Sequence, residues 1–339
     1  MRARRLLTAI ALVTGATVAG AAQWTVTEID GDPVMRGLPR DAIPAIDNPV
    51  FVPAARAGFM RGDEYVIGIT DGTTTKAYSA LHLNAHEIVN DTLGGRAIAV
   101  TWCPLCYTGI VYDRVVEGRA LSFGVSGLLW RENLLMYDRE TDSWWSQASG
   151  RAIQGTLRGR ELTMVSATMV TWQTWLQKYP QTLVLEKTGS RSTIDVYARY
   201  HASSDLGVTG RMRPGAGRIA AKTRIVGFRL DGRAFAVELS RLPSSGILIA
   251  TAAETPVVVA GVPDGSGARI FRAGGHAFGV ENRNGQSVLV DEASRSEWDA
   301  FEGRARQGAM AGSRLEEVPA SMSYWFAWQA FFPSTTVVR

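Results

Sequence analysis

The sequence predicts a mainly β protein, β-rich within the α+β class, in which two tandem related modules each combine short strands with one helix. Short segments rich in β-branched and aromatic residues, bounded by Gly, Asp or Asn, are typical of strands. One segment near the end of each module instead carries apolar residues at helical spacing. The two halves of the chain also resemble each other, so we expect a pseudo-twofold relation between the modules.

The internal repeat is clearest near the module ends, where residues 138–184 align without a gap to residues 291–337. Weaker matches continue upstream of this block. The repeat divides the chain into module one at residues 50–186, a connector at residues 187–214 and a degenerate repeat module at residues 215–339. The matching residues include the tryptophans Trp145, Trp172 and Trp175 and their counterparts Trp298, Trp325 and Trp328.

Module one is expected to contain five clear strands followed by a helix. The helix is predicted over residues 166–179, with Pro180 just beyond its end. Both modules repeat the tryptophan pair of this segment, so we expect Trp172 and Trp175 to be core residues rather than a ligand platform. The strands are predicted at residues 65–69, 98–102, 109–112, 120–125 and 134–137.

The N-terminus has the pattern of a secretory signal peptide at residues 1–21. A basic start precedes an apolar run from Leu6 to Ala22 that ends in small residues. We therefore expect an exported protein, periplasmic or otherwise extracytoplasmic. The alternative is an uncleaved anchor helix, which would be the chain's only membrane contact. Three arginines of this segment supply most of the formal net charge of +4.

Composition excludes several classes of protein. The 339 residues are 46% hydrophobic and 20% charged, which suits a globular protein with a sizeable core. No basic stripe with interleaved aromatics is present, so we expect no nucleic-acid partner. No phosphate loop or dinucleotide fingerprint occurs, so we expect no nucleotide cofactor.

The two modules differ most around a Cys-Pro-Leu-Cys string. Cys103 aligns with Val262 and Cys106 with Gly265, while His86 aligns approximately with Ser245. Features that both copies share mostly serve the fold, whereas features present in one copy are candidates for function. Module one therefore holds the candidate site. The other polar residues found only in this copy are Glu87, Asn90, Asp91, Ser146 and Gln147.

The leading hypothesis is an exported metal-binding protein, which could be a metalloenzyme. The two cysteines lie between apolar runs, so we place them at the tip of a hairpin, where both thiols can point at one centre. Cys103, Cys106 and His86 would form a three-ligand set with an open fourth position, as in catalytic zinc sites. Thiolate and imidazole ligands also suit copper.

Two alternatives remain open. In the first, Cys103 and Cys106 are the catalytic pair of a cell-envelope thiol–disulfide oxidoreductase, although the strand expected after them gives no helix N-terminus to stabilise a thiolate. In the second, the protein is a non-catalytic binding module with a structural disulfide, which an oxidising compartment permits. A bridge over so short a loop stabilises little, about 2 kcal/mol.

The remaining polar candidates would surround the thiols and orient ligands or bind substrate. These are Glu87, Asn90, Asp91, Ser146 and Gln147. For the last four, the alternative is ordinary turn and cap chemistry. The partner would be an unknown small molecule or an envelope protein.

Three strings of module one resemble the DUF3179 family of uncharacterised proteins. They are residues 86–91 (HEIVND), 100–106 (VTWCPLC) and 123–129 (FGVSGLL). The segment from Met136 to Gln147 adds to the resemblance, which covers most of the mature chain. It implies that HEIVND and CPLC are family hallmarks, and it implies no established activity. Tyr107 stands where the family leads us to expect Gly or Asn, and its side chain would narrow the opening at the thiols.

Overall fold

The computed structural model describes residues 25–188, 194–209, 219–283 and 285–339. The predicted signal peptide at residues 1–21 lies outside these residues, as do parts of the connector. Strands hold 47% of the residues and helices 10%, which confirms a mainly β fold. Among the described residues, no helix has the length and apolar character needed to cross a membrane.

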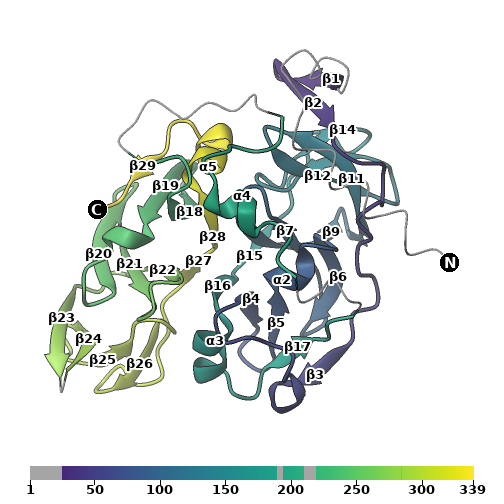
Figure 1. Ribbon diagram of the computed structural model, residues 1–339. Helices are drawn as coiled ribbons and strands as arrows, with labels where there is room; N and C mark the ends of the chain where they lie inside the picture. Colours follow the sequence, from purple (N-terminus) through teal and green to yellow (C-terminus); the bar gives the residue numbers. More distant parts are fainter. Residues whose placement is uncertain (1–24, 189–193, 210–218, 284) are drawn as a thin grey trace.

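Module one and the segment before it form three larger sheets, in which neighbouring strands are antiparallel except for the parallel pair Thr75–Ser79 and Leu183–Leu185 (Figure 1). The first has the order β16-β4-β5-β17-β3, with strands Thr168–Thr171, Tyr65–Thr70, Thr75–Ser79, Leu183–Leu185 and Phe51–Pro53. The second has the order β15-β8-β7-β6, with strands Met164–Val165, Thr108–Asp113, Arg96–Cys103 and Ile88–Leu93. The third has the order β1-β2-β11-β12-β13-β14, with strands Thr25–Ile29, Asp32–Arg36, Phe123–Trp130, Asn133–Asp138, Trp144–Ser146 and Ala152–Gln154.

The second half of the chain repeats these strand orders in three sheets of its own. One has the order β28-β18-β19-β29, with strands Ala320–Tyr324, Arg224–Leu230, Arg233–Glu238 and Thr336–Val337. The next has the order β20-β21-β22-β27, with strands Ile247–Ala252, Thr255–Gly261, Ala268–Arg272 and Glu317–Val318. The last has the order β23-β24-β25-β26, with strands Phe278–Arg283, Gln286–Asp291, Glu297–Asp299 and Arg304–Gln307. The pseudo-twofold relation itself stays a prediction.

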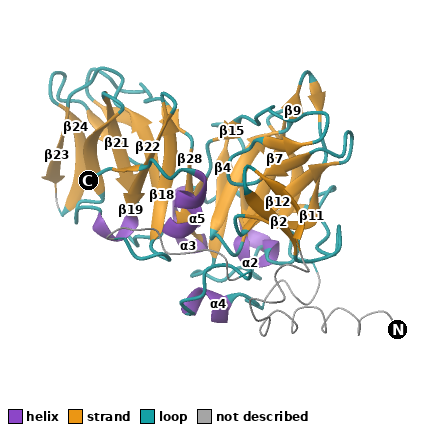
Figure 2. Ribbon diagram, turned by 90° about the horizontal axis from the view of Figure 1, so that it is seen from above, coloured by secondary structure: helices purple, strands orange, loops and turns teal. Residues whose placement is uncertain are grey.

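Helices are few and short, and they gather near one side of the molecule (Figure 2). The described α-helices are α2 at Ala80–Leu83, α3 at Trp172–Lys178, α4 at Ala198–Ala202 and α5 at Trp325–Phe331. Short 3-10 turns occur at Ala54–Arg56 and Leu239–Arg241, and a small ribbon pairs β9 at Val115–Val116 with β10 at Arg119–Ala120.

The helix predicted over residues 166–179 is wrong for residues 166–171, which are not helical. Residues 168–171 form strand β16, which pairs with β4, and the helix begins only at Trp172. Thr168, Val170 and Thr171 are β-branched and favour a strand. Thr171 then caps the helix, because its side chain accepts the backbone N–H of Thr174. The strand predicted at 120–125 is also interrupted, since β10 ends at Ala120 and β11 begins at Phe123.

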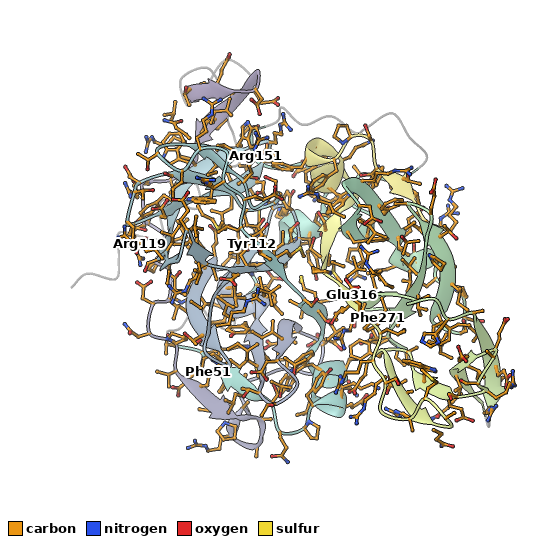
Figure 3. All side chains as sticks on the ribbon, turned by 180° about the vertical axis from the view of Figure 1, so that it is seen from behind. Phe51, Tyr112, Arg119, Arg151, Phe271 and Glu316 are labelled. Carbon is orange, nitrogen blue, oxygen red and sulfur yellow. The ribbon has the colours of Figure 1, made fainter. Side chains whose placement is uncertain are left out.

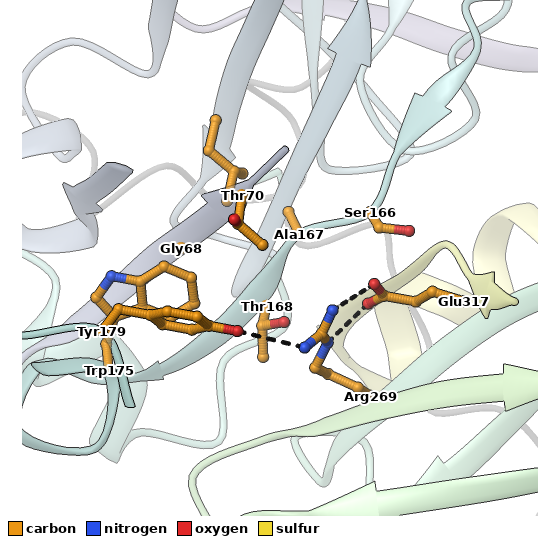
Figure 4. A pocket seen from close by; sticks show the side chains of 10 residues that line it. Gly68, Thr70, Ser166, Ala167, Thr168, Trp175, Tyr179, Arg269 and Glu317 are labelled. Carbon is orange, nitrogen blue, oxygen red and sulfur yellow. Dashed lines mark hydrogen bonds and ion pairs between the residues drawn. The ribbon is translucent and has the colours of Figure 1, made fainter. Parts of the chain in front are cut away.

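Each tryptophan pair packs into the core of its own half, as predicted. Trp175 lies against Gly68 of β4 (Figure 4). Trp328 lies against Gly227 of β18 in the same way. The indole N–H of Trp175 donates to Thr182 at 3.0 Å, and that of Trp328 donates to Thr335 at 2.8 Å. A β-carbon on Gly68 would come within 2.3 Å of the Trp175 ring, so only glycine fits there.

The two halves share one continuous core. The largest buried cluster includes Ile67 and Val111 from module one together with Val226 and Ile270 from the second half. At the edge of this core, the Arg269 guanidinium donates to Glu317 at 2.8 Å and reaches the Tyr179 hydroxyl of module one at 3.5 Å (Figure 4).

Gly68→Ala tests the close contact between glycine and tryptophan. We expect it to lower the free energy of unfolding by about 1–3 kcal/mol, because the new methyl group overlaps the Trp175 ring. Gly58→Ala is the control, since its β-carbon would meet no atom within 4 Å. Denaturant midpoints of the two variants measure the difference, and equal midpoints would contradict the packing described here.

Candidate functional site

The Cys-Pro-Leu-Cys string forms the tip of a β-hairpin, as predicted. Strands β7 and β8 pair antiparallel up to Cys103 and Thr108. The turn closes through a hydrogen bond from the Cys106 N–H to the Cys103 carbonyl at 3.2 Å. Tyr107 follows with a φ of 54°, a left-handed conformation that Gly and Asn adopt most easily. This conformation explains why either residue is expected at the position.

Both cysteines are free and buried, and each residue has 1% of its surface exposed. Burial raises the pKa of the Cys103 thiol. Hydrogen bonds from the Cys106 thiol and from backbone N–H groups nearby outweigh this effect, so the pKa of Cys103 is lowered. The pKa of Cys106 is raised well above its usual value by burial and by the neighbouring Cys103. The pair therefore has one thiol that ionises readily and one that holds its proton.

Glu87, which we expected to lie around the thiols, directly precedes β6, and its backbone carbonyl accepts the N–H of Trp102 at 2.7 Å. Glu87 is 8% exposed. Its φ of 58° lies in the left-handed region of backbone conformation, directly before β6. Burial and the nearby Cys103 sulfur hold its pKa well above the usual range. This shift favours the neutral form of the carboxyl group, which adds no negative charge near the Cys103 thiol.

Gln147 connects to the thiols through a residue that the sequence did not single out. The amide of Asn133, in β12, donates to the Cys106 sulfur at 3.4 Å and to Gln147 at 2.8 Å. Gln147 in turn donates to Thr101 and to the carbonyl of Thr108, both at 3.1 Å. This buried network holds the two strands of the hairpin against β12.

The other polar candidates have structural partners. Asn90 exchanges two hydrogen bonds with the backbone of Phe123, at 2.8 and 2.9 Å, which ties β6 to β11. Asp91 forms a buried ion pair with Lys76 at 2.8 Å. Ser146 accepts the N–H of Ser149 at 3.3 Å, which is turn chemistry.

His86 contacts neither thiol by any interaction found among the described residues. Its Nδ1 lies 2.9 Å from the Pro44 carbonyl oxygen, and its ring centroid lies 4.7 Å from that of His82. No group of three His, Cys, Asp or Glu side chains in the described part of the chain could hold a metal ion. His82 itself is buried, and neither of its ring nitrogens has a hydrogen-bond partner among the residues that the structure describes. Burial lowers its pKa to about 4.

The connector covers the thiols, and sequence reasoning missed this. The Tyr200 hydroxyl of α4 donates to the Leu105 carbonyl at 2.8 Å and accepts the Gly207 N–H at 2.9 Å. The Val208 N–H donates to the buried Glu132 carboxylate at 2.8 Å. Helix α4 lies at the junction of the two halves (Figures 1 and 2). The group of aromatic side chains at residues 197, 200 and 201 was the sequence feature that could have indicated this cover.

The second half also contacts the turn directly. The backbone N–H of Tyr324, at the end of β28, donates to the Cys106 carbonyl at 2.9 Å. Its hydroxyl lies 3.1 Å from Nδ1 of His201 in the connector. The Tyr107 ring packs against both, with centroids 5.2 Å from Tyr324 and 5.1 Å from His201. Tyr107 therefore helps to close the site, as its bulk predicted.

Comparison with known proteins assigns the chain to a family and gives no activity. The family described as "Protein of unknown function (DUF3179)" matches residues 40–335, so the chain belongs to this family. No curated protein and no solved structure matches the chain.

The unequal thiols predict unequal alkylation by iodoacetamide. In the Cys106→Ser variant, Cys103 keeps a hydroxyl group as a neighbouring donor. The pH at which alkylation of Cys103 reaches half its maximal rate should therefore lie below about 8.5, the pKa of an ordinary thiol. Cys103→Ser leaves Cys106, whose half-maximal pH should lie above that value. Both variants keep the same cover, which makes each the control for the other. A lower midpoint for Cys106 would contradict the assignment.

Proposed function

We propose that the protein is an exported thiol–disulfide redox protein whose centre is the Cys103–Cys106 pair. The observation that carries the proposal is the position of two free, buried cysteines at the ends of one four-residue turn, which closes through the hydrogen bond from the Cys106 N–H to the Cys103 carbonyl. Cysteines three residues apart in such a turn suit reversible pairing. The signal-like N-terminus supports export to a compartment where disulfides form.

In the proposed reaction, the Cys103 thiolate attacks one sulfur of a partner disulfide. The partner's other sulfur leaves as a thiolate, and a mixed disulfide with Cys103 remains. Cys106 then gives its proton to the first departing thiolate and attacks the Cys103 sulfur. This attack releases the partner's second sulfur as a thiolate, which takes up the proton that Cys103 lost at the start. The two cysteines lose two electrons, and the partner disulfide gains them.

The surroundings support a thiolate at Cys103 rather than at Cys106. Backbone N–H groups of Leu105, Cys106 and Leu134 point at the Cys103 sulfur and replace the helix N-terminus that the hairpin lacks. The raised pKa of the buried Glu87 carboxyl favours its neutral form, which limits repulsion between like charges. Access to the pair requires a small disulfide or a movement of the connector, with Tyr200, away from the cysteine turn.

The experiment is a titration of the mature chain with reduced and oxidised glutathione, read by mass spectrometry after acid trapping. We expect a reversible Cys103–Cys106 bond with a potential between about −270 and −120 mV, the span of dedicated oxidoreductases. Single Cys→Ser variants cannot form this bond and serve as controls. A potential below about −300 mV would mark a structural bridge of a binding module and overturn the proposal.

A second candidate is a soft metal site, with the two thiolates as its ligands. The observation in its favour is that both sulfurs lie in an apolar cluster with Leu105, Phe123 and Tyr324, a dry environment that suits Cu(I) bound by thiolates. Asn133 would orient the Cys106 sulfur. Zinc would need His86 as a third ligand, and so a rearrangement of the Pro44 contact.

Elemental analysis of protein purified under reducing conditions separates the two candidates. A metal centre predicts stoichiometric copper or zinc that is lost in the Cys103→Ser, Cys106→Ser double variant. Retention of zinc in this variant but not in His86→Ala would place the metal elsewhere. Metal-free protein that still cycles between thiol and disulfide would leave the redox function standing and exclude the metal one.

A further inference from the structure

A hollow of about 470 Å³ lies where the two halves meet, away from the thiols. Its walls come from the β11–β12 hairpin tip, from the segment after β14, and from Arg229 and Phe332 of the second half. This volume lies within the range of small-molecule sites, about 300–1,000 Å³. Figure 3 shows Arg151, one of the lining residues, on the side of module one that faces the second half.

The hollow has an excess of positive charge. Four arginines line it, against the two carboxylates Asp30 and Glu161. Glu161 pairs with Arg229 at 2.5 Å, and Arg131 pairs with Asp32 at 2.7 Å. Within the described residues, the side chains of the remaining two arginines form no ion pair. These two are Arg151 and Arg158.

The wall between these arginines and the second half is rigid. The Arg131 guanidinium lies 4.5 Å over the Trp130 ring and donates to the carbonyl of Ala330, at the end of α5, at 2.9 Å. The Trp130 and Phe331 rings meet edge to face at 5.5 Å. These contacts join module one to the end of α5 and form one wall of the hollow.

We propose that this hollow binds a small anion with two acidic groups, either carboxylates or phosphates, through Arg151 and Arg158. Guanidinium groups form paired, charge-assisted hydrogen bonds with carboxylates and phosphates, and both of these groups are free to do so. The rings of Trp130 and Phe332 supply surface for an apolar part of the ligand. The site stands on its own residues and does not depend on the redox function.

The geometry also relates this site to the thiols. Arg131, Glu132 and Asn133 are consecutive at the hairpin tip. Arg131 faces the hollow, and Asn133 bonds the Cys106 sulfur at 3.4 Å. One hairpin therefore separates the anion site from the dithiol.

The test is calorimetric titration of the mature chain with pyrophosphate and, separately, with succinate, at constant ionic strength. We expect at least one probe to bind in the millimolar range or tighter. The double variant Arg151→Gln, Arg158→Gln should bind it at least about tenfold more weakly. The matched control is Arg119→Gln, Arg314→Gln, which removes the same charge from exposed arginines outside the hollow and should change the affinity less than about twofold.

Each result decides the proposal. Binding of pyrophosphate alone identifies a phosphate ligand, and binding of succinate alone identifies a dicarboxylate; either supports the site. The proposal is overturned if neither probe binds, if the Arg151/Arg158 variant binds normally, or if the control weakens binding equally, which would indicate diffuse charge. Thermal unfolding of both variants at the wild-type midpoint shows that the comparison concerns folded protein.

Discussion

The hydrogen bond from the Tyr324 N–H to the Cys106 carbonyl is the contact on which the arrangement of the site depends. A buried hairpin tip cannot leave its carbonyl groups without donors, because each unpaired buried group costs free energy. The Cys-Pro-Leu-Cys turn obtains one donor from the second half and another from the Tyr200 hydroxyl. These two segments support the burial of the turn together with the Thr108 hydroxyl, which also donates to the Cys106 carbonyl at 3.1 Å.

The second half makes a reciprocal contact. The backbone N–H of Thr171, which aligns with Tyr324, donates to Ser266 at 3.2 Å in the turn that aligns with the cysteines. That turn closes through a hydrogen bond from the Gly265 N–H to the Val262 carbonyl, which is equivalent to the bond from the Cys106 N–H to the Cys103 carbonyl in the cysteine turn. Each half thus completes the turn of the other, and only one turn carries thiols. The second copy acts as a support for the first.

The sequence predicted what local pattern and internal repetition determine. The strand character of β7 and β8, the hairpin between the cysteines and the burial of Trp175 all follow from residue pattern. Comparison of the copies placed Glu87 near the thiols. It could not foresee the cover, because the contact between Tyr200 and Leu105 joins residues 95 positions apart. The helix that begins at Trp172 was extended too far because β-branched residues and apolar spacing conflict in that segment.

His86 shows the limit of ligand chemistry read from sequence. It belongs to the same unshared cluster as Glu87, yet only Glu87 interacts with Cys103, while His86 packs on His82. The most direct test is a crystal structure of the mature chain, solved reduced and oxidised, with anomalous data. Our account predicts a Cys103–Cys106 bond in the oxidised crystal, metal-free sulfurs in the reduced one, and the Tyr324 contact in both. Separated sulfurs after oxidation, or a metal bound by both thiolates and His86, would contradict it.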